Sequence, residues 1–205
     1  MRAQGASFIQ SFIQTVRSSL GWIYFSGFVF LVGIVCGFIV SWVNPDLSRE
    51  FFRSWGQEVQ KLVSGSGLVT SLNIFERNGL IMIFSMMFGF LGLVPALVAF
   101  GNGMVFGMIF GFRDIYSNLS LLKIVFLILP HGVIEIFATI VGLGLSLKTG
   151  VHWIMVKKNK RKTFVEDAQT LAHSAVVVLG LLLIAALVEG MVTPALACLV
   201  VRVCF

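Results

Sequence analysis

The sequence predicts an all-α integral membrane protein that forms a single membrane domain over residues 1–205, with about five transmembrane helices. Of its 205 residues, 58% are hydrophobic and only 12% are charged, and the mean hydropathy is +0.97. Soluble domains carry about 25% charged residues. The apolar residues occur in long runs, which are typical of helices that cross a bilayer. We therefore expect the lipid bilayer to be the main surrounding of the chain.

Two further segments, near residues 1–20 and 47–63, have the pattern of amphipathic helices. Large apolar side chains recur there at helical spacing, with polar side chains on the opposite face. Such a helix lies in the membrane interface or packs on the protein's own helices, and either arrangement fits both segments. The apolar stripes are Phe8, Ile9, Phe12, Ile13, Val16 and Leu20 in the first, and Phe51, Phe52, Trp55, Val59, Leu62 and Val63 in the second.

The first span is expected at about 21–43, where an uncharged run ends at Asn44-Pro45-Asp46. The run from Asn78 to Phe112 is too long for one span. Pro95 and the sequence Gly101-Asn102-Gly103 divide it into two tightly joined helices, at about 78–98 and 101–113, which either both cross or form a re-entrant pair.

Gly103, Gly107 and Gly111 recur at every fourth residue of the third predicted helix. Small residues at this spacing allow transmembrane helices to approach closely. We expect these glycines to serve helix packing, and we expect homo-oligomers to form through such glycine-rich faces.

Charge predicts the orientation of the remaining segments. Spans are expected at about 121–147 and 173–201, joined by a loop at 148–172 that carries six basic and two acidic residues. Basic residues collect on the cytoplasmic side of membrane proteins, so we expect a multi-pass protein of the cell membrane with the N-terminus and this loop in the cytoplasm and the C-terminus outside. The basic residues lie between apolar segments, so the net charge of +6 reflects topology and no nucleic-acid partner is expected.

The most informative residues are polar groups inside apolar runs. His131 and Glu135 lie four residues apart and therefore share one helix face, next to the helix-kinking Pro130. Glu189 lies within the last span, and the remaining acidic residues lie in polar segments. Ionisable groups at membrane depth face protein or water, so we expect an intramembrane polar cluster. Its members are His131, Glu135, Glu189, Asn102, Asn78 and Thr193.

Three interpretations of this cluster stay open. The polar groups hydrogen-bond across helices and hold them together, or they line a path for an ion or solute. In the third, His131 and Glu135 are metal ligands, but metal-dependent hydrolysis needs at least a third ligand and an open coordination position. We expect no catalytic residues and no cofactor. The three cysteines, at Cys36, Cys198 and Cys204, have no metal-type spacing and are expected to be buried as small apolar residues.

Four pieces of the sequence, in the same order, resemble the stage II sporulation protein M family, also called DUF95. Pro130-His131-Gly132, followed two residues later by Glu135, resembles its PHG-x-x-E signature. The segments 73–78 and 101–103 resemble its asparagine before the second span and its NG turn, and 188–194 resembles its E…TP ending.

The resemblance implies a polytopic membrane protein of about five spans, with Asn78, Asn102, His131, Glu135 and Glu189 as its intramembrane polar set. In spore-forming bacteria the namesake anchors and localises peptidoglycan-degrading enzymes. We therefore expect a non-enzymatic scaffold or anchor for membrane or cell-envelope proteins. The alternative is a transporter or channel for an ion or small solute that uses His131, Glu135 and Glu189, and an intramembrane metal-dependent enzyme is less favoured.

Overall fold

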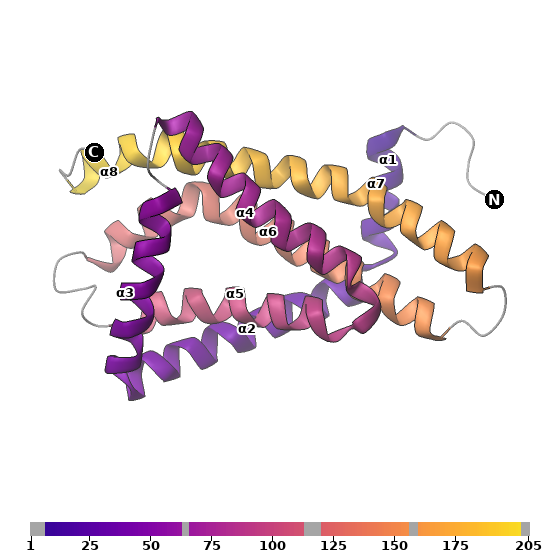
Figure 1. The fold of residues 1–205 in the computed structure, drawn as a ribbon, viewed down its shortest axis with the longest axis horizontal. Helices are drawn as coiled ribbons and strands as arrows, with labels where there is room; N and C mark the ends of the chain where they lie inside the picture. Colours follow the sequence, from indigo (N-terminus) through magenta and orange to yellow (C-terminus); the bar gives the residue numbers. More distant parts are fainter. Residues whose placement is uncertain (1–6, 63–65, 113–119, 156–159, 202–205) are drawn as a thin grey trace.

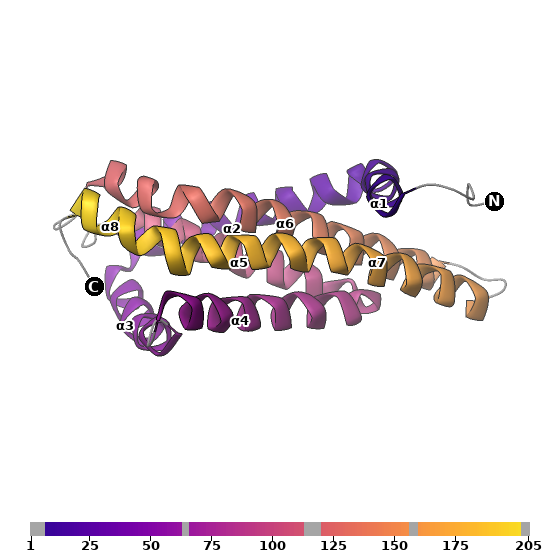
Figure 2. The same ribbon diagram turned by 90° about the horizontal axis from the view of Figure 1, so that it is seen from above.

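Five long helices run roughly side by side along the longest axis of the molecule (Figures 1 and 2). The computed structural model describes residues 7–62, 66–112, 120–155 and 160–201, and every regular element in these ranges is a helix. The long helices are α2 (Leu20–Val43), α4 (Gly67–Met87), α5 (Leu93–Gly111), α6 (Leu121–Met155) and α7 (Lys160–Leu187). A short π-helical segment, η3 (Val188–Val192), continues α7 into α8 (Thr193–Val201).

The predicted all-α membrane class is confirmed. Among the described residues, four helical stretches are long and apolar enough to cross a membrane: Leu20–Val43, Leu93–Gly111, Leu122–Met155 and Thr163–Leu196. The fifth long helix, α4, runs beside them but carries the exposed charges of Glu76 and Arg77 at its middle. The predicted number of about five spans therefore corresponds to four strongly apolar helices and one that is more polar.

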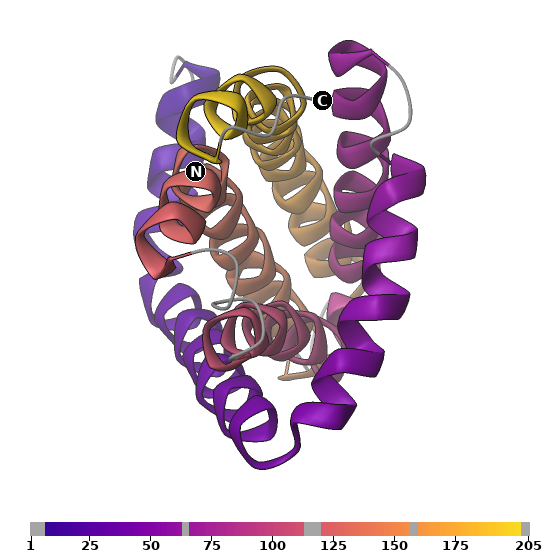
Figure 3. The same ribbon diagram turned by 90° about the vertical axis from the view of Figure 1, so that its left-hand side faces the viewer.

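The two amphipathic helices, α1 (Phe8–Arg17) and α3 (Pro45–Leu62), lie across opposite ends of the bundle (Figure 1). Seen from one end, α3 runs from the end of α2 toward the beginning of α4 (Figure 3). Both pack on the chain's own helices. The Phe8 ring stacks on that of His173 at 4.0 Å, and the Phe52 ring stacks on that of Phe112 at 5.1 Å. Because Ile9 remains 65% exposed, α1 also presents apolar surface to its surroundings.

Local capping explains where these two helices begin. The Ser7 hydroxyl accepts a hydrogen bond from the Gln10 backbone, and the Gln10 side chain accepts one from the Ser7 backbone, which is a capping box. Asn44 Oδ1 accepts a hydrogen bond from the Leu47 N–H at 3.1 Å. Pro45 then occupies the first helical position, where its missing N–H costs nothing.

Glycines bring α2 and α5 into direct backbone contact. A Cβ added at Gly103 would overlap the Phe30 carbonyl, and one at Gly107 would overlap the Ile34 carbonyl. At Gly111 it would come within 2.7 Å of the Phe38 carbonyl oxygen. The predicted glycine stripe therefore packs inside the chain. This face is occupied by α2, and the expected homo-oligomer stays a prediction.

The predicted break between the second and third helices is also in the wrong place. The residues Gly101-Asn102-Gly103 are helical, and the chain turns at the short 3-10 helix η1 (Gly89–Leu91) instead. Gly92 follows with a φ of 62°, a conformation that glycine adopts without strain. Pro95 is tolerated in the first turn of α5, where no intrahelical N–H bond is lost. Correspondingly, α4 begins at Gly67 rather than at the predicted residue 78.

The predicted polar loop at 148–172 is largely helical. Residues 148–155 extend α6 and residues 160–172 belong to α7, while the residues between them lie outside the described ranges. Hydropathy marks where a chain leaves the membrane, but a helix can continue into water because its backbone bonds are internal. The last predicted span, 173–201, is likewise interrupted by the π-helical segment η3.

The core of the bundle surrounds α6. Ala138, Val141 and Leu143 of this helix are at most 2% exposed. They belong to one apolar cluster with Ile23 of α2, Met82 and Met86 of α4, Ala99 of α5, and Val178 and Leu182 of α7. The Ser146 hydroxyl adds a polar tie by donating to the Ser85 carbonyl of α4 at 2.8 Å.

The glycine contact gives a direct test of this packing. We expect Gly107→Ala to destabilise the protein by about 1–3 kcal/mol, because the new methyl group forces the backbones of α2 and α5 apart. Thermal unfolding in detergent, followed by tryptophan fluorescence, measures this change. The matched control is Gly101→Ala on the same helix, where an added Cβ meets nothing within 4 Å. Alanine there should be neutral or stabilising by up to about 1 kcal/mol. Equal effects of the two substitutions would contradict the packing.

Candidate functional site

Most of the predicted polar cluster gathers where α4, α6 and the α7–α8 junction meet. His131 and Glu135 come from α6, Asn78 from the middle of α4, Glu189 from η3, and Thr193 from the beginning of α8. All five side chains belong to half-buried residues. Segments that are far apart in sequence therefore contribute polar groups to one region of the bundle.

A hydrogen bond joins α4 to α6 within this region. Asn78 Nδ2 donates to Glu135 Oε1 at 3.0 Å. The carboxylate also interacts electrostatically with Arg77, the exposed neighbour of Asn78 on α4. Glu135 thus has a hydrogen-bond donor and a cation on the same neighbouring helix, which compensates part of the cost of its burial.

The His131 side chain has its partner on a different helix. Its Nδ1 lies 3.3 Å from Thr193 Oγ1, at the start of α8. The threonine hydroxyl is also 3.4 Å from the Val188 carbonyl, to which it can donate. When it does so, it accepts from a protonated His131 Nδ1, so one imidazole tautomer satisfies both contacts. His131 and Glu135 share a face of α6, but they are bonded to α8 and α4 respectively.

Glu189 lies in a π-helical turn. The Thr193 N–H bonds the Val188 carbonyl, five residues earlier, and Pro194 contributes no N–H to the turn after it. Segments of this kind occur often at functional sites. The turn lies against the start of α4, since a Cβ added at Gly190 would meet the Ser71 hydroxyl and the Gly67 carbonyl. Glu189 is also within electrostatic range of Glu135.

Asn102 does not join the cluster as predicted. Its Nδ2 donates to the Val98 carbonyl of its own helix at 2.8 Å. An asparagine can satisfy its amide on the preceding turn of a helix, and Asn102 belongs to α5, which packs mainly on α2. Sequence position within an apolar run indicated a polar group at depth, but not which helix it would face.

A metal site receives no third ligand in the described part of the chain. No group of three or more His, Cys, Asp or Glu residues there is arranged to hold a metal ion. The other two histidines lie elsewhere: His152 Nδ1 is 2.9 Å from Asp167 Oδ2, and His173 stacks on Phe8. The described residues therefore do not complete the His131–Glu135 pair into a hydrolytic centre.

Sequence reasoning missed several polar contacts that position these helices. The interaction of Arg77 with Glu135 is one of them, although the place of Arg77 beside Asn78 in the sequence could have suggested a partner for an embedded acid. Lys148 Nζ donates to the Ser18 carbonyl at 3.0 Å and to the hydroxyls of Ser18 and Ser19 at 2.9 Å each. Asn73 Nδ2 donates to the Leu62 carbonyl at 3.1 Å and so ties α4 to the end of α3.

The Asn78–Glu135 contact predicts a measurable coupling between α4 and α6. In a double-mutant cycle of Asn78→Ala and Glu135→Ala, we expect a coupling free energy of about 0.6 kcal/mol, and at most about 1.7, as for other hydrogen bonds between membrane helices. Denaturant unfolding in mixed micelles measures it. The control cycle pairs Asn102→Ala with Glu135→Ala and should give no coupling, because the Asn102 amide donates to the Val98 carbonyl of its own helix. Coupling of equal size in both cycles would refute the assignment.

Comparison with known proteins identifies a family for this chain. No curated protein and no solved structure matches the chain. The family model for stage II sporulation protein M matches residues 26–194. The match extends from α2 to the Thr193-Pro194 sequence at the start of α8 and includes every residue of the polar cluster. The chain therefore belongs to the stage II sporulation protein M family of polytopic membrane proteins.

Proposed function

We propose that this protein is a non-enzymatic scaffold of the cell membrane that holds membrane or cell-envelope proteins in place. The observation that carries this proposal is the pairing of the intramembrane polar groups across helices. Asn78 binds Glu135 between α4 and α6, and Thr193 binds His131 between α8 and α6. These bonds fasten a bundle together, which is what a scaffold requires of its membrane part.

The solvent-exposed polar face of α3 supports contacts with a partner outside the membrane. α3 lies across one end of the bundle (Figure 1) and buries aromatic residues against it, as the Phe52–Phe112 stack shows. Its opposite face carries exposed side chains of both charges, namely Asp46, Arg49, Glu50, Arg53 and Glu58. Mixed, exposed charges on a helix fixed at a membrane surface suit a partner protein.

The arrangement of the ends supports a cytoplasmic N-terminus. Helix α1 and the end of α6 that leads to the basic residues of α7 lie at the same end of the bundle, while α3 and α8 lie at the other (Figure 1). Cys198 of α8 is disulfide-bonded, which differs from the predicted buried thiol, whereas Cys36 is a free, half-buried thiol. Disulfides persist on the oxidising side of a cell membrane, which supports an outer location for α3 and α8.

Ion or solute transport is the second candidate. It is favoured by two carboxylates, Glu135 and Glu189, that lie within electrostatic range of each other in apolar surroundings. An open groove of about 470 Å³ is lined by Lys61, Asn73, Glu76 and Arg77. Arg77 also interacts electrostatically with Glu135. A transporter would need Glu135 and Glu189 to carry flux, whereas a scaffold would show no flux that depends on them. Flux measurements therefore distinguish the two functions.

The orientation predicts a labelling pattern. In a background with serine at the three native cysteine positions, Glu50→Cys on α3 should react in intact cells with a membrane-impermeant maleimide. Glu166→Cys on α7 should react only after the cells are opened, because both positions are exposed but lie at opposite ends of the bundle. The reverse pattern would place the N-terminus outside.

The scaffold proposal predicts no ion flux that depends on the embedded acids. Liposomes that contain the purified protein and a pH-sensitive dye should acidify no faster than protein-free liposomes under an imposed potential, and sodium uptake should likewise stay at background. The variants Glu135→Gln and Glu189→Gln should leave this rate unchanged. Flux in the parent protein that either variant removes, with the fold intact, would overturn the scaffold in favour of transport.

The matching positive test follows partner contact in cells. A photo-cross-linking residue at exposed Arg53 of α3 should give a discrete cross-linked envelope protein, and Glu189→Gln should retain it. The same cross-linker at exposed Glu166 of α7, on the other side of the membrane, is the control. No discrete product from Arg53, or the same products from both positions, would contradict a partner surface on α3.

A further inference from the structure

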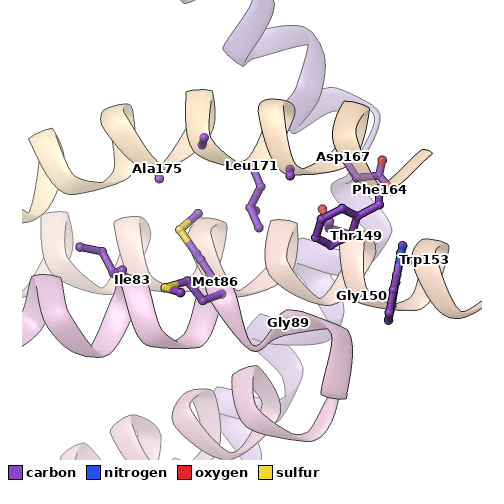
Figure 4. Close-up of a pocket in the computed structure, with 13 residues that line it drawn as sticks. Ile83, Met86, Gly89, Thr149, Gly150, Trp153, Phe164, Asp167, Leu171 and Ala175 are labelled. Carbon is purple, nitrogen blue, oxygen red and sulfur yellow. The ribbon is translucent and has the colours of Figure 1, made fainter. Parts of the chain in front are cut away.

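One side of α4 is not covered by any contact described so far. Helix α4 forms a flank of the bundle (Figure 2). Its inner side packs on the other helices, and the buried Met86 lies there between α4 and α7 (Figure 4). On its opposite side, large exposed residues recur every three or four positions, and we call this side the outward face of α4. Its members are Val69, Leu72, Glu76, Leu80, Ile83 and Met87.

Two opposite charges, Glu76 and Arg77, lie at the middle of this face. Both side chains are exposed, and within the described part of the chain neither makes a hydrogen bond or an ion pair. Arg77 is within electrostatic range of Glu135. Adjacent residues of a helix do not face each other, so the two charges are not positioned to pair within α4. The nearby Lys61 ammonium, which lines the same open groove, is 2.7 Å from the Glu58 carboxylate.

These charges lie at the depth of the hydrocarbon core. Asn78, the residue after Arg77, bonds Glu135, which lies about 20 Å along the apolar stretch Leu122–Met155 at a rise of about 1.5 Å per residue. The core of a bilayer is about 30 Å thick. Charged side chains at such depth are costly and face protein or water. Acyl chains are therefore a poor cover for the middle of the outward face.

The charge pair is complementary to itself across a two-fold axis. When two copies pack through the outward face of α4, Arg77 of each copy meets Glu76 of the other, because long side chains on a helix lean toward its N-terminus. The apolar residues above and below then pack across the same contact, from Val69 to Met87. That distance is about 27 Å, close to the thickness of the core. A different membrane protein would need its own pair of opposite charges at this depth.

We propose that the outward face of α4 is the contact between two copies of this chain, with Glu76 and Arg77 forming reciprocal ion pairs across a two-fold axis. The contact differs from the predicted one, because the glycine stripe of α5 is occupied by α2. The inference depends on neither candidate function, since a scaffold and a transporter are both compatible with a dimer.

Charge reversal in liposomes tests this contact. In the background with serine at the native cysteine positions, the exposed position of Glu166→Cys carries a donor or an acceptor dye. Energy transfer between copies in liposomes of phosphatidylcholine and phosphatidylglycerol measures their association. We expect the parent to associate, and Glu76→Arg or Arg77→Glu to weaken association at least about tenfold, because like charges then face each other. An equimolar mixture of the two variants should regain the transfer of the parent, which also shows that both variants are folded.

Cysteine cross-linking tests which face is involved. With an oxidant, Leu80→Cys on the outward face should give a disulfide-linked dimer. Leu31→Cys on α2 is the matched control and should stay monomeric, because the two leucines are 59% and 58% exposed. A monomeric parent, equal cross-linking from both positions, or a mixture of charge variants that stays weak would overturn the proposal. Single-charge variants that associate as the parent does would also overturn it and would leave Glu76 and Arg77 to water in the groove.

Discussion

The structure depends on how closely membrane helices can approach one another when lipid gives them little hydrophobic reason to associate. Gly103 and Gly107 of α5 bring its backbone against that of α2, so that dispersion contacts act where the two helices approach closely. On the other side of α6, side chains replace glycines: Ser146 bonds the Ser85 carbonyl, and Asn78 bonds Glu135. Between α2 and α5 both kinds of contact act together, because the Ser41 hydroxyl donates to the Met108 carbonyl at 3.1 Å.

The polar bonds explain why ionisable residues are retained where burial is costly. A carboxylate in an apolar region requires donors or cations, and Glu135 finds both on α4 in Asn78 and Arg77. Since these partners lie on a neighbouring helix, the residues that are most costly to bury also specify which helices adjoin. The π-helical turn at Glu189 extends this principle, because its small residue Gly190 lets α4 begin directly against it.

Sequence reasoning predicted the helical class, the family and most of the polar cluster, because apolar run length and the spacing of His131 and Glu135 are local properties. It misplaced the turn before α5, since Gly101-Asn102-Gly103 looks like a break, whereas the three residues are helical and Gly103 is needed at a helix contact. Sequence reasoning also did not predict the full length of α6 and α7, because helices continue beyond the membrane. The partner of Asn102, and the use of the glycine stripe within the chain rather than between chains, depend on tertiary packing that periodicity does not encode.

The central claim is that the embedded polar groups fasten helices and do not conduct. A high-resolution experimental structure in lipid that places ions and waters around Glu135 and Glu189 tests it most directly. The account predicts that Asn78 remains bonded to Glu135 and Thr193 to His131, with no continuous water between Arg77 and the opposite face. A file of waters through these residues, or an ion coordinated by Glu135 and Glu189, would contradict it and make transport the function to pursue.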